Sequence, residues 1–73
     1  LDRGDPEAAL AFASDVIAHD PCDEPAREVA IRAHLAVGDR AAALRTYRQY
    51  RDVLKSELQV EPSATLSALV AGS

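Results

Sequence analysis

The sequence has few of the residues that build disulfides, metal sites and large aromatic cores. It contains one cysteine, one phenylalanine and two tyrosines, and it has neither tryptophan nor methionine. A single cysteine excludes an internal disulfide and provides no metal-ligand spacing. Fifteen of the 73 residues are alanine. Because small side chains let helices approach closely, this composition favours tightly packed helices over a roomy pocket.

The sequence also lacks the patterns that mark enzymes and membrane proteins. Its three glycines do not form a phosphate-binding loop, and no Ser-His-Asp set or pair of catalytic carboxylates is present. No apolar run approaches the roughly 18 residues of a membrane span, and no signal peptide opens the chain. We therefore expect a cytoplasmic, non-catalytic domain with no cofactor, no metal and no membrane contact.

Basic residues are scarce as well. The chain has 12 acidic and 8 basic residues and a formal net charge of -4 at pH 7, whereas DNA-binding domains usually carry a basic excess. One basic stripe, formed by Arg48, Arg51 and Lys55, lies within about 60° on a helix. It could contact phosphate or an acidic partner, but a solvated helix face is the commoner reason for such a stripe. We expect no direct contact with nucleic acid from this segment.

The chain does contain a clear series of helix start and stop signals. Asp5 and Pro6 begin a first helix that continues to about His19 and stops at Asp20-Pro21. A second helix follows Asp23 and ends at Gly38, and the longest helix then runs from Asp39 to about Leu58. Ser63 caps a short fourth helix over 65–71, and no segment alternates as a strand would. The predicted fold is all-α, with three main helices and a short C-terminal fourth.

One short sequence occurs twice. GDPEAAL at residues 4–10 returns as GDRAAAL at residues 38–44, an offset of 34 residues. Helical hairpins that repeat every 34 residues are typical of tetratricopeptide repeats. In each copy the glycine ends one helix, the aspartate caps the next, and Ala9 or Ala43 is small where two helices meet. Two capped helices could match by chance in an alanine-rich chain, but the closing Asp20-Pro21 favours the repeat.

A second and more specific resemblance covers nearly the whole chain. The residues that carry it are Asp20-Pro21, Asp23-Glu24, Gly38-Asp39-Arg40, Ala43-Leu44, Tyr47, Tyr50-Arg51, Leu54, Glu57-Leu58 and the tail Val60-Glu61-Pro62-Ser63. Together they resemble the bacterial transcriptional activator domain (BTAD), a tetratricopeptide-like domain of actinobacterial antibiotic-regulatory transcription factors. The tail is the most telling part, because generic repeats have no reason to follow a long helix with this sequence.

The resemblance implies a regulatory role without chemistry of its own. Such a domain usually lies beside a winged-helix DNA-binding domain in the same polypeptide, and it self-associates or regulates DNA binding. We therefore expect residues 1–73 to be a single domain of a longer regulator. Its partners would be its own DNA-binding or effector domain, or a second copy in a homodimer. The alternative is a generic tetratricopeptide scaffold that binds a peptide or partner protein in its concave groove, unrelated to transcription.

The family geometry also implies a candidate protein-binding surface. In such hairpins the first helix of each pair lines the concave side, which here indicates Glu28, Arg32 and Leu35. Leu35 would be the apolar contact, whereas Glu28 and Arg32, four residues apart, could instead pair only with each other. His34 and Cys22 stand where the family would have larger apolar residues. A pH-sensitive contact or a ligand role is possible for His34, but no second ligand lies at helical spacing, so we expect packing positions.

One face of the first helix is expected to be partly open. Ala9, Phe12, Ala13 and Val16 share this apolar face, but the repeat register would place another helix before Gly4, where the sequence has three residues. Repeat units bury their apolar faces against their neighbours. We therefore expect part of this face to be exposed and to be covered by another chain or helix.

Overall fold

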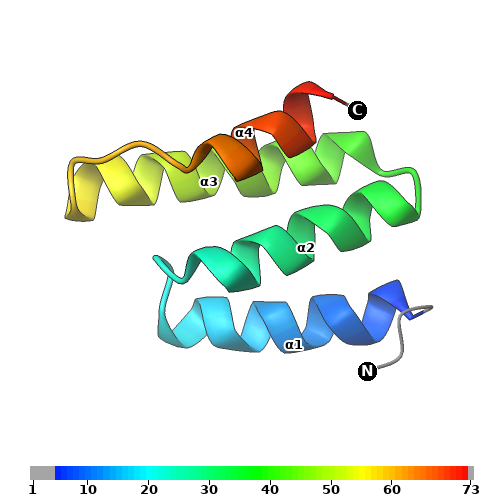
Figure 1. Ribbon diagram of the computed structural model, residues 1–73. Coiled ribbons are helices and arrows are strands. Elements are labelled where there is room, and N and C mark those ends of the chain that lie inside the picture. The colour runs from blue at the N-terminus through cyan, green and yellow to red at the C-terminus, as the bar shows by residue number, and fades with distance from the viewer. Residues whose placement is uncertain (1–4, 73) are drawn as a thin grey trace.

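The chain folds into four α-helices joined by short connections. The computed structural model describes residues 5–72, in which α1 spans Pro6–His19, α2 Glu24–Ala36, α3 Arg40–Glu57 and α4 Ala64–Ala71 (Figure 1). No strand occurs within residues 5–72, and none of the helices described there is long and apolar enough to cross a membrane. The predicted all-α fold, with three main helices and a short fourth, is confirmed.

Each helix begins at a side chain that caps its first turn. In α1, α2 and α3 an aspartate carboxylate accepts a hydrogen bond from the backbone N–H three residues later, and in α4 a serine hydroxyl accepts it. The four bonds are Ala8 N to Asp5 Oδ1 (3.1 Å), Ala26 N to Asp23 Oδ2 (3.2 Å), Ala42 N to Asp39 Oδ1 (3.0 Å) and Leu66 N to Ser63 Oγ (3.4 Å). Each such cap contributes about 1 kcal/mol, and all four predicted helix starts are confirmed.

The turn between α2 and α3 depends on Gly38. Its φ of 81° lies in the left-handed region, which glycine adopts without steric cost. Gly38 donates its N–H to the carbonyl of Leu35 (3.0 Å), and Asp39 donates its N–H to the carbonyl of His34 (2.8 Å). These two bonds satisfy the last carbonyls of α2 in the manner of a Schellman motif. The matching Gly4 of the repeat lies outside the described residues.

The helices pack in an order that leaves α1 at one side. α2 lies between α1 and α3, and α4 lies across α2 and α3 (Figure 1). Within residues 5–72, α1 therefore packs against α2 alone, whereas α2 packs against three helices. This arrangement gives α1 less tertiary support than any other main helix.

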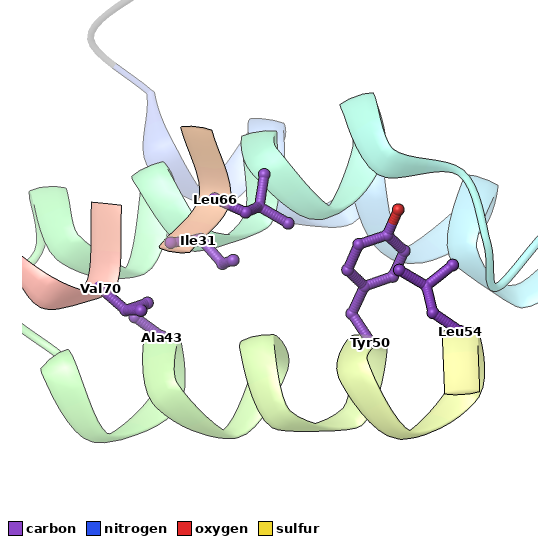
Figure 2. Packing of buried hydrophobic residues seen from close by; sticks show 6 residues of the cluster. All are labelled: Ile31, Ala43, Tyr50, Leu54, Leu66 and Val70. Carbon is purple, nitrogen blue, oxygen red and sulfur yellow. The ribbon is translucent and has the colours of Figure 1, made fainter. Parts of the chain in front are cut away.

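The main core lies among α2, α3 and α4 (Figure 2). It consists of Ile31 from α2, Ala43, Tyr50 and Leu54 from α3, and Leu66 and Val70 from α4. Buried alanines complete the interior, namely Ala13 of α1, Ala26, Ala30 and Ala33 of α2, and Ala42 of α3. Since these side chains are small, the helices pack closely, as the composition indicated.

The tail before α4 returns the chain to the core. Pro62 is buried, and the Tyr47 hydroxyl of α3 lies 3.0 Å from the Ser67 hydroxyl of α4. Leu66, in the first turn of α4, has no exposed surface. The segment that carries the most telling part of the sequence resemblance therefore serves to place α4 over α2 and α3.

Candidate functional site

The largest exposed apolar side chain in the described part of the chain lies on the outer side of α1. Phe12 is 66% exposed, while Ala13 on the adjoining side is fully buried. Ala8 is exposed, and Ala9 and Val16 are half-buried; these three lie within one turn of Phe12 on the helix surface. We call Ala8, Ala9, Phe12 and Val16 the Phe12 patch. The prediction that part of this face is open is confirmed.

The Phe12 patch differs from the other exposed apolar residues. Val37, Leu58 and Val60 are also exposed, but they lie where α2 and α3 end and in the connection before α4. Phe12 instead lies in the middle of a helix, with small side chains preceding it by three and four residues. Burying a phenylalanine contributes roughly 1.5–3 kcal/mol, and alanines let a second helix approach closely. The patch is thus suited to contact another apolar surface.

The structure pairs two of the three residues expected on the concave side. Arg32 Nη2 lies 2.8 Å from Glu28 Oε2, and Arg32 Nε donates a hydrogen bond to the same oxygen at 2.9 Å. Leu35 is half-buried and packs against the main core. Glu28 and Arg32 therefore balance each other's charge, and Leu35 presents only part of its side chain to solvent. A binding role for these residues stays a prediction.

The basic stripe lies on the solvent side of α3. Arg48, Arg51 and Lys55 are all exposed, and Arg51 Nη2 lies 3.5 Å from Asp52 Oδ1. Both partners of this ion pair are well exposed, so it contributes little to stability. The acidic neighbour reduces the positive field of the stripe, in keeping with a solvated helix face.

A hydrogen bond inside the molecule joins α2 to α3. The hydroxyl of Tyr50, a residue only 2% exposed, donates to Glu24 Oε1 at 3.0 Å. Burial raises the pKa of the Tyr50 hydroxyl, and the hydrogen bond to the Glu24 carboxylate raises this pKa further. The neutral phenol is therefore the stable form at physiological pH, and it fixes Glu24 at the start of α2.

A buried arginine that the sequence did not single out lies next to this pair. Arg27 of α2 is 5% exposed. Its Nη1 donates to the carbonyl of Thr46 and its Nη2 to that of Pro21, both at 3.5 Å, and its Cζ lies 5.6 Å from the centre of the Tyr50 ring. Its Nε is buried without a hydrogen-bond partner. Burial lowers the pKa of the Arg27 guanidinium, and Tyr50 offsets this effect only in part.

Arg27 lines a surface groove of about 320 Å³ between α1 and α3. The floor of the groove comes from α2 and the walls from the helices on either side. Its lining residues are Arg27, Ala30 and His34 of α2, Leu10, Ser14, Ile17 and Ala18 of α1, and Thr46 and Gln49 of α3. The groove exists because α1 packs on α2 without reaching α3. This space lies at the surface, outside the closely packed interior.

One sequence signal pointed to the burial of Arg27. It precedes Ile31 by four residues, and positions four apart share a helix side, so it lies on the side of α2 that carries a core residue. His34 is half-buried in the groove, and Cys22 is half-buried against the main core, as expected for packing positions. Within residues 5–72, no group of three or more His, Cys, Asp or Glu side chains is placed to hold a metal ion.

Comparison with known proteins places this architecture in a family. The family model described as the bacterial transcriptional activator domain matches residues 1–72. Comparison with curated proteins and with solved structures found no match. The matched span includes all four helices and the tail before α4. The chain therefore belongs to the bacterial transcriptional activator domain family, whose members are regulatory domains of transcription factors.

Proposed function

We propose that this chain is a non-catalytic protein-interaction domain of a bacterial transcription factor and that it acts by self-association through the Phe12 patch. The family supports the regulatory role and favours it over a generic tetratricopeptide scaffold. The exposure of Phe12 supports the choice of surface, and it is the single observation that carries the proposal.

The packing order explains why α1 is the side that associates. α1 packs against α2 alone, whereas α3 packs against α2 and α4. Repeat helices are stabilised by neighbours on both sides, so a second α1 laid against the Phe12 patch would give α1 a neighbour on its other side. A contact between identical patches is self-complementary and closes as a dimer about a two-fold axis. The same patch would serve a contact with another domain of the same regulator.

The test is sedimentation velocity over a concentration series, on the wild-type chain and on Phe12→Ser. We expect the weight-average sedimentation coefficient of the wild type to rise with concentration and that of Phe12→Ser to stay at the monomer value. Leu58→Ser is the matched control, because Leu58 is 57% exposed but lies outside the patch, and it should behave as the wild type. Circular dichroism of each variant verifies that the helices are retained.

Two results would contradict this proposal. A wild-type chain that stays monomeric up to millimolar concentration would exclude self-association. Association of Phe12→Ser equal to that of the wild type would exclude the Phe12 patch as the contact surface. Either result would leave the family and the fold unchanged and would direct attention to contacts with other domains.

The proposal also assigns DNA contact to another domain of the regulator. The net charge of the chain is -4, and Arg51 of the basic stripe is already paired with Asp52. A fluorescence titration with double-stranded DNA at low salt, where phosphate contacts are strongest, should show no affinity. Affinity that falls when Arg48, Arg51 and Lys55 are replaced by glutamine would instead assign DNA binding to the stripe.

A further inference from the structure

One of the residues that line the groove between α1 and α3 is a buried arginine, Arg27, whose charge no carboxylate of residues 5–72 balances. Arg27 is 95% removed from solvent, since its exposure is 5%, and among residues 5–72 no carboxylate oxygen lies within ion-pair distance of its guanidinium. Of the two acidic residues nearest to it on α2, Glu28 pairs with Arg32, and Glu24 accepts the hydroxyl of Tyr50. A buried charge without a counter-charge destabilises the fold, so a charged side chain at this position calls for an explanation.

Apart from the Tyr50 ring, whose centre lies 5.6 Å from the Arg27 Cζ, the contacts that Arg27 makes are weak. Its two hydrogen bonds are to neutral backbone carbonyls, of Thr46 and Pro21, and both are 3.5 Å long; this is beyond the usual N–H···O distance. Its Nε has no partner. A guanidinium has five N–H donors arranged to match a carboxylate. The geometry of Arg27 is thus that of a donor group that still lacks its acceptor.

The lining of the groove indicates what kind of molecule would bring that acceptor. Leu10, Ile17, Ala18 and Ala30 provide apolar surface, and Ser14, Thr46, Gln49 and His34 provide hydrogen-bonding groups. With Arg27, the lining is about equally apolar and polar, and small-ligand sites likewise combine apolar surface with polar groups that orient the ligand. The volume of about 320 Å³ is at the small end of their range, which suits a small molecule better than a length of peptide.

We propose that this groove binds a small carboxylic acid, whose carboxylate pairs with Arg27 and whose apolar body lies against Leu10, Ile17 and Ala30. Such an acid would contact α1, α2 and α3 together, although α1 and α3 do not pack on each other. Binding would therefore fix α1 relative to the rest of the domain. This site is separate from the Phe12 patch and does not rest on the proposed self-association, so Phe12→Ser should bind the acid as the wild type does.

The test is a titration of the ¹⁵N-labelled chain with hexanoate and with benzoate, followed by amide and arginine side-chain NMR signals. We expect saturable shifts at groove positions, including Ala30 and Thr46, and at the Nε–H of Arg27. Hexanamide and benzamide keep the apolar bodies of the acids but carry no charge. Because they cannot form the charge-assisted bond, they should bind at least about tenfold more weakly than the acids.

Two variants separate a binding role from a structural one. Arg27→Met keeps an unbranched side chain and removes the guanidinium with its charge, and it should lose the shifts at the groove. Arg32→Met removes an exposed charge of α2 that is already paired with Glu28 and should bind the acids as the wild type does. Arg27→Met should also be as stable as the wild type or more so, because a neutral side chain costs less to bury than an unpaired charge.

Several results would overturn the proposal. The acids could fail to shift any groove signal, or the neutral amides could shift them as much as the acids do. Arg27→Met could be strongly destabilised in thermal unfolding, which would make Arg27 a structural tie between α2 and the Thr46 and Pro21 carbonyls. Finally, a blocked peptide containing glutamate could bind much more tightly than either free acid, which would make a protein segment the occupant and the small-acid assignment wrong.

Discussion

At the residue scale, the bond between Tyr50 and Glu24 connects burial, charge and helix placement. Tyr50 is part of the main core, yet its hydroxyl reaches a carboxylate at the start of α2 (3.0 Å). Arg27 lies over the ring of the same tyrosine. One aromatic side chain thus supplies core volume, a hydrogen-bond donor and a face for a cation.

Replacing Tyr50 by phenylalanine should reveal the contribution of this bond. We expect Tyr50→Phe to lower the free energy of unfolding by about 1.5–3 kcal/mol, the usual range for a hydrogen bond to a charged group. Tyr47→Phe is the matched control, because the Tyr47 hydroxyl bonds a neutral hydroxyl, that of Ser67, and should cost about 1 kcal/mol. Urea unfolding measures both, and equal costs would contradict the special role of Glu24.

The same bond also makes the stability of the fold depend on pH, and the direction of this dependence follows from the pKa of Tyr50. Folding raises the pKa of Tyr50 above its ordinary value of 10.0, so the folded state holds this proton more tightly than the unfolded state does. The resulting stability is fully present below about pH 10 and is lost as pH rises above it. Urea unfolding between pH 8 and 11 should therefore show a steeper alkaline loss of stability for the wild type than for Tyr50→Phe, within the ranges where both fold.

Two residues have backbones in the left-handed region, and substituting them should change the stability of the fold in opposite directions. Gly38 has φ 81° and Gln59, just after α3, has φ 57°. A Cβ at position 38 would meet no atom within 4 Å, so Gly38→Ala should cost only backbone strain, about 1 kcal/mol. Gln59→Gly should relieve the same strain and stabilise the fold by about 0.5–1 kcal/mol. Thermal unfolding of both variants checks this, and changes of equal sign would contradict it.

At the element scale, α1 should be the least stable of the three main helices, because it packs against α2 alone. Stability within a domain follows local packing, and weakly supported elements open without global unfolding. Amide hydrogen exchange, measured on monomeric Phe12→Ser, should show protection in the middle of α1 at least about tenfold below that at Ile31 and Leu54. Equal protection in α1 and in the main core would mean that the domain opens only as a whole.

The helices were largely predictable from sequence because their signals are local. The aspartates at 5, 23 and 39 and Ser63 each accept a bond from the N–H three residues later, and Gly38 ends α2 with the expected conformation. The exposure of Phe12 was predictable too, because the repeat register shows where a neighbouring helix is needed. The helix starts and ends depend on residues a few positions apart, and the repeat register depends on a sequence match at an offset of 34 residues.

The groove and Arg27 were not predictable in the same way. The groove depends on how far α1 and α3 stand apart across α2, a distance that no local pattern fixes. Arg27 carries a charged side chain, which normally indicates a solvent position, yet tertiary packing buries it beneath Thr46 and beside Tyr50. The pairing of Glu28 with Arg32 was foreseen as one of two alternatives, since four-residue spacing permits it.

At the scale of the whole molecule, the domain is asymmetric in its packing. Its main core lies among α2, α3 and α4, while α1 covers one side of α2 (Figures 1 and 2). Phe12 of α1 is exposed to solvent. Domains of this size bury only about 60% of their unfolded surface and have a small stability margin. Covering the Phe12 patch, as the proposed self-association would do, would therefore add to stability as well as form a contact, so association and folding would be coupled.

The most direct measurement of that link is the concentration dependence of the amide NMR spectrum of the wild-type chain. From micromolar to millimolar concentration, shifts should be confined to α1 residues in and next to the Phe12 patch, and they should be absent in Phe12→Ser. A spectrum that does not change with concentration, or shifts centred on Glu28, Arg32 and Leu35 instead, would contradict association through α1.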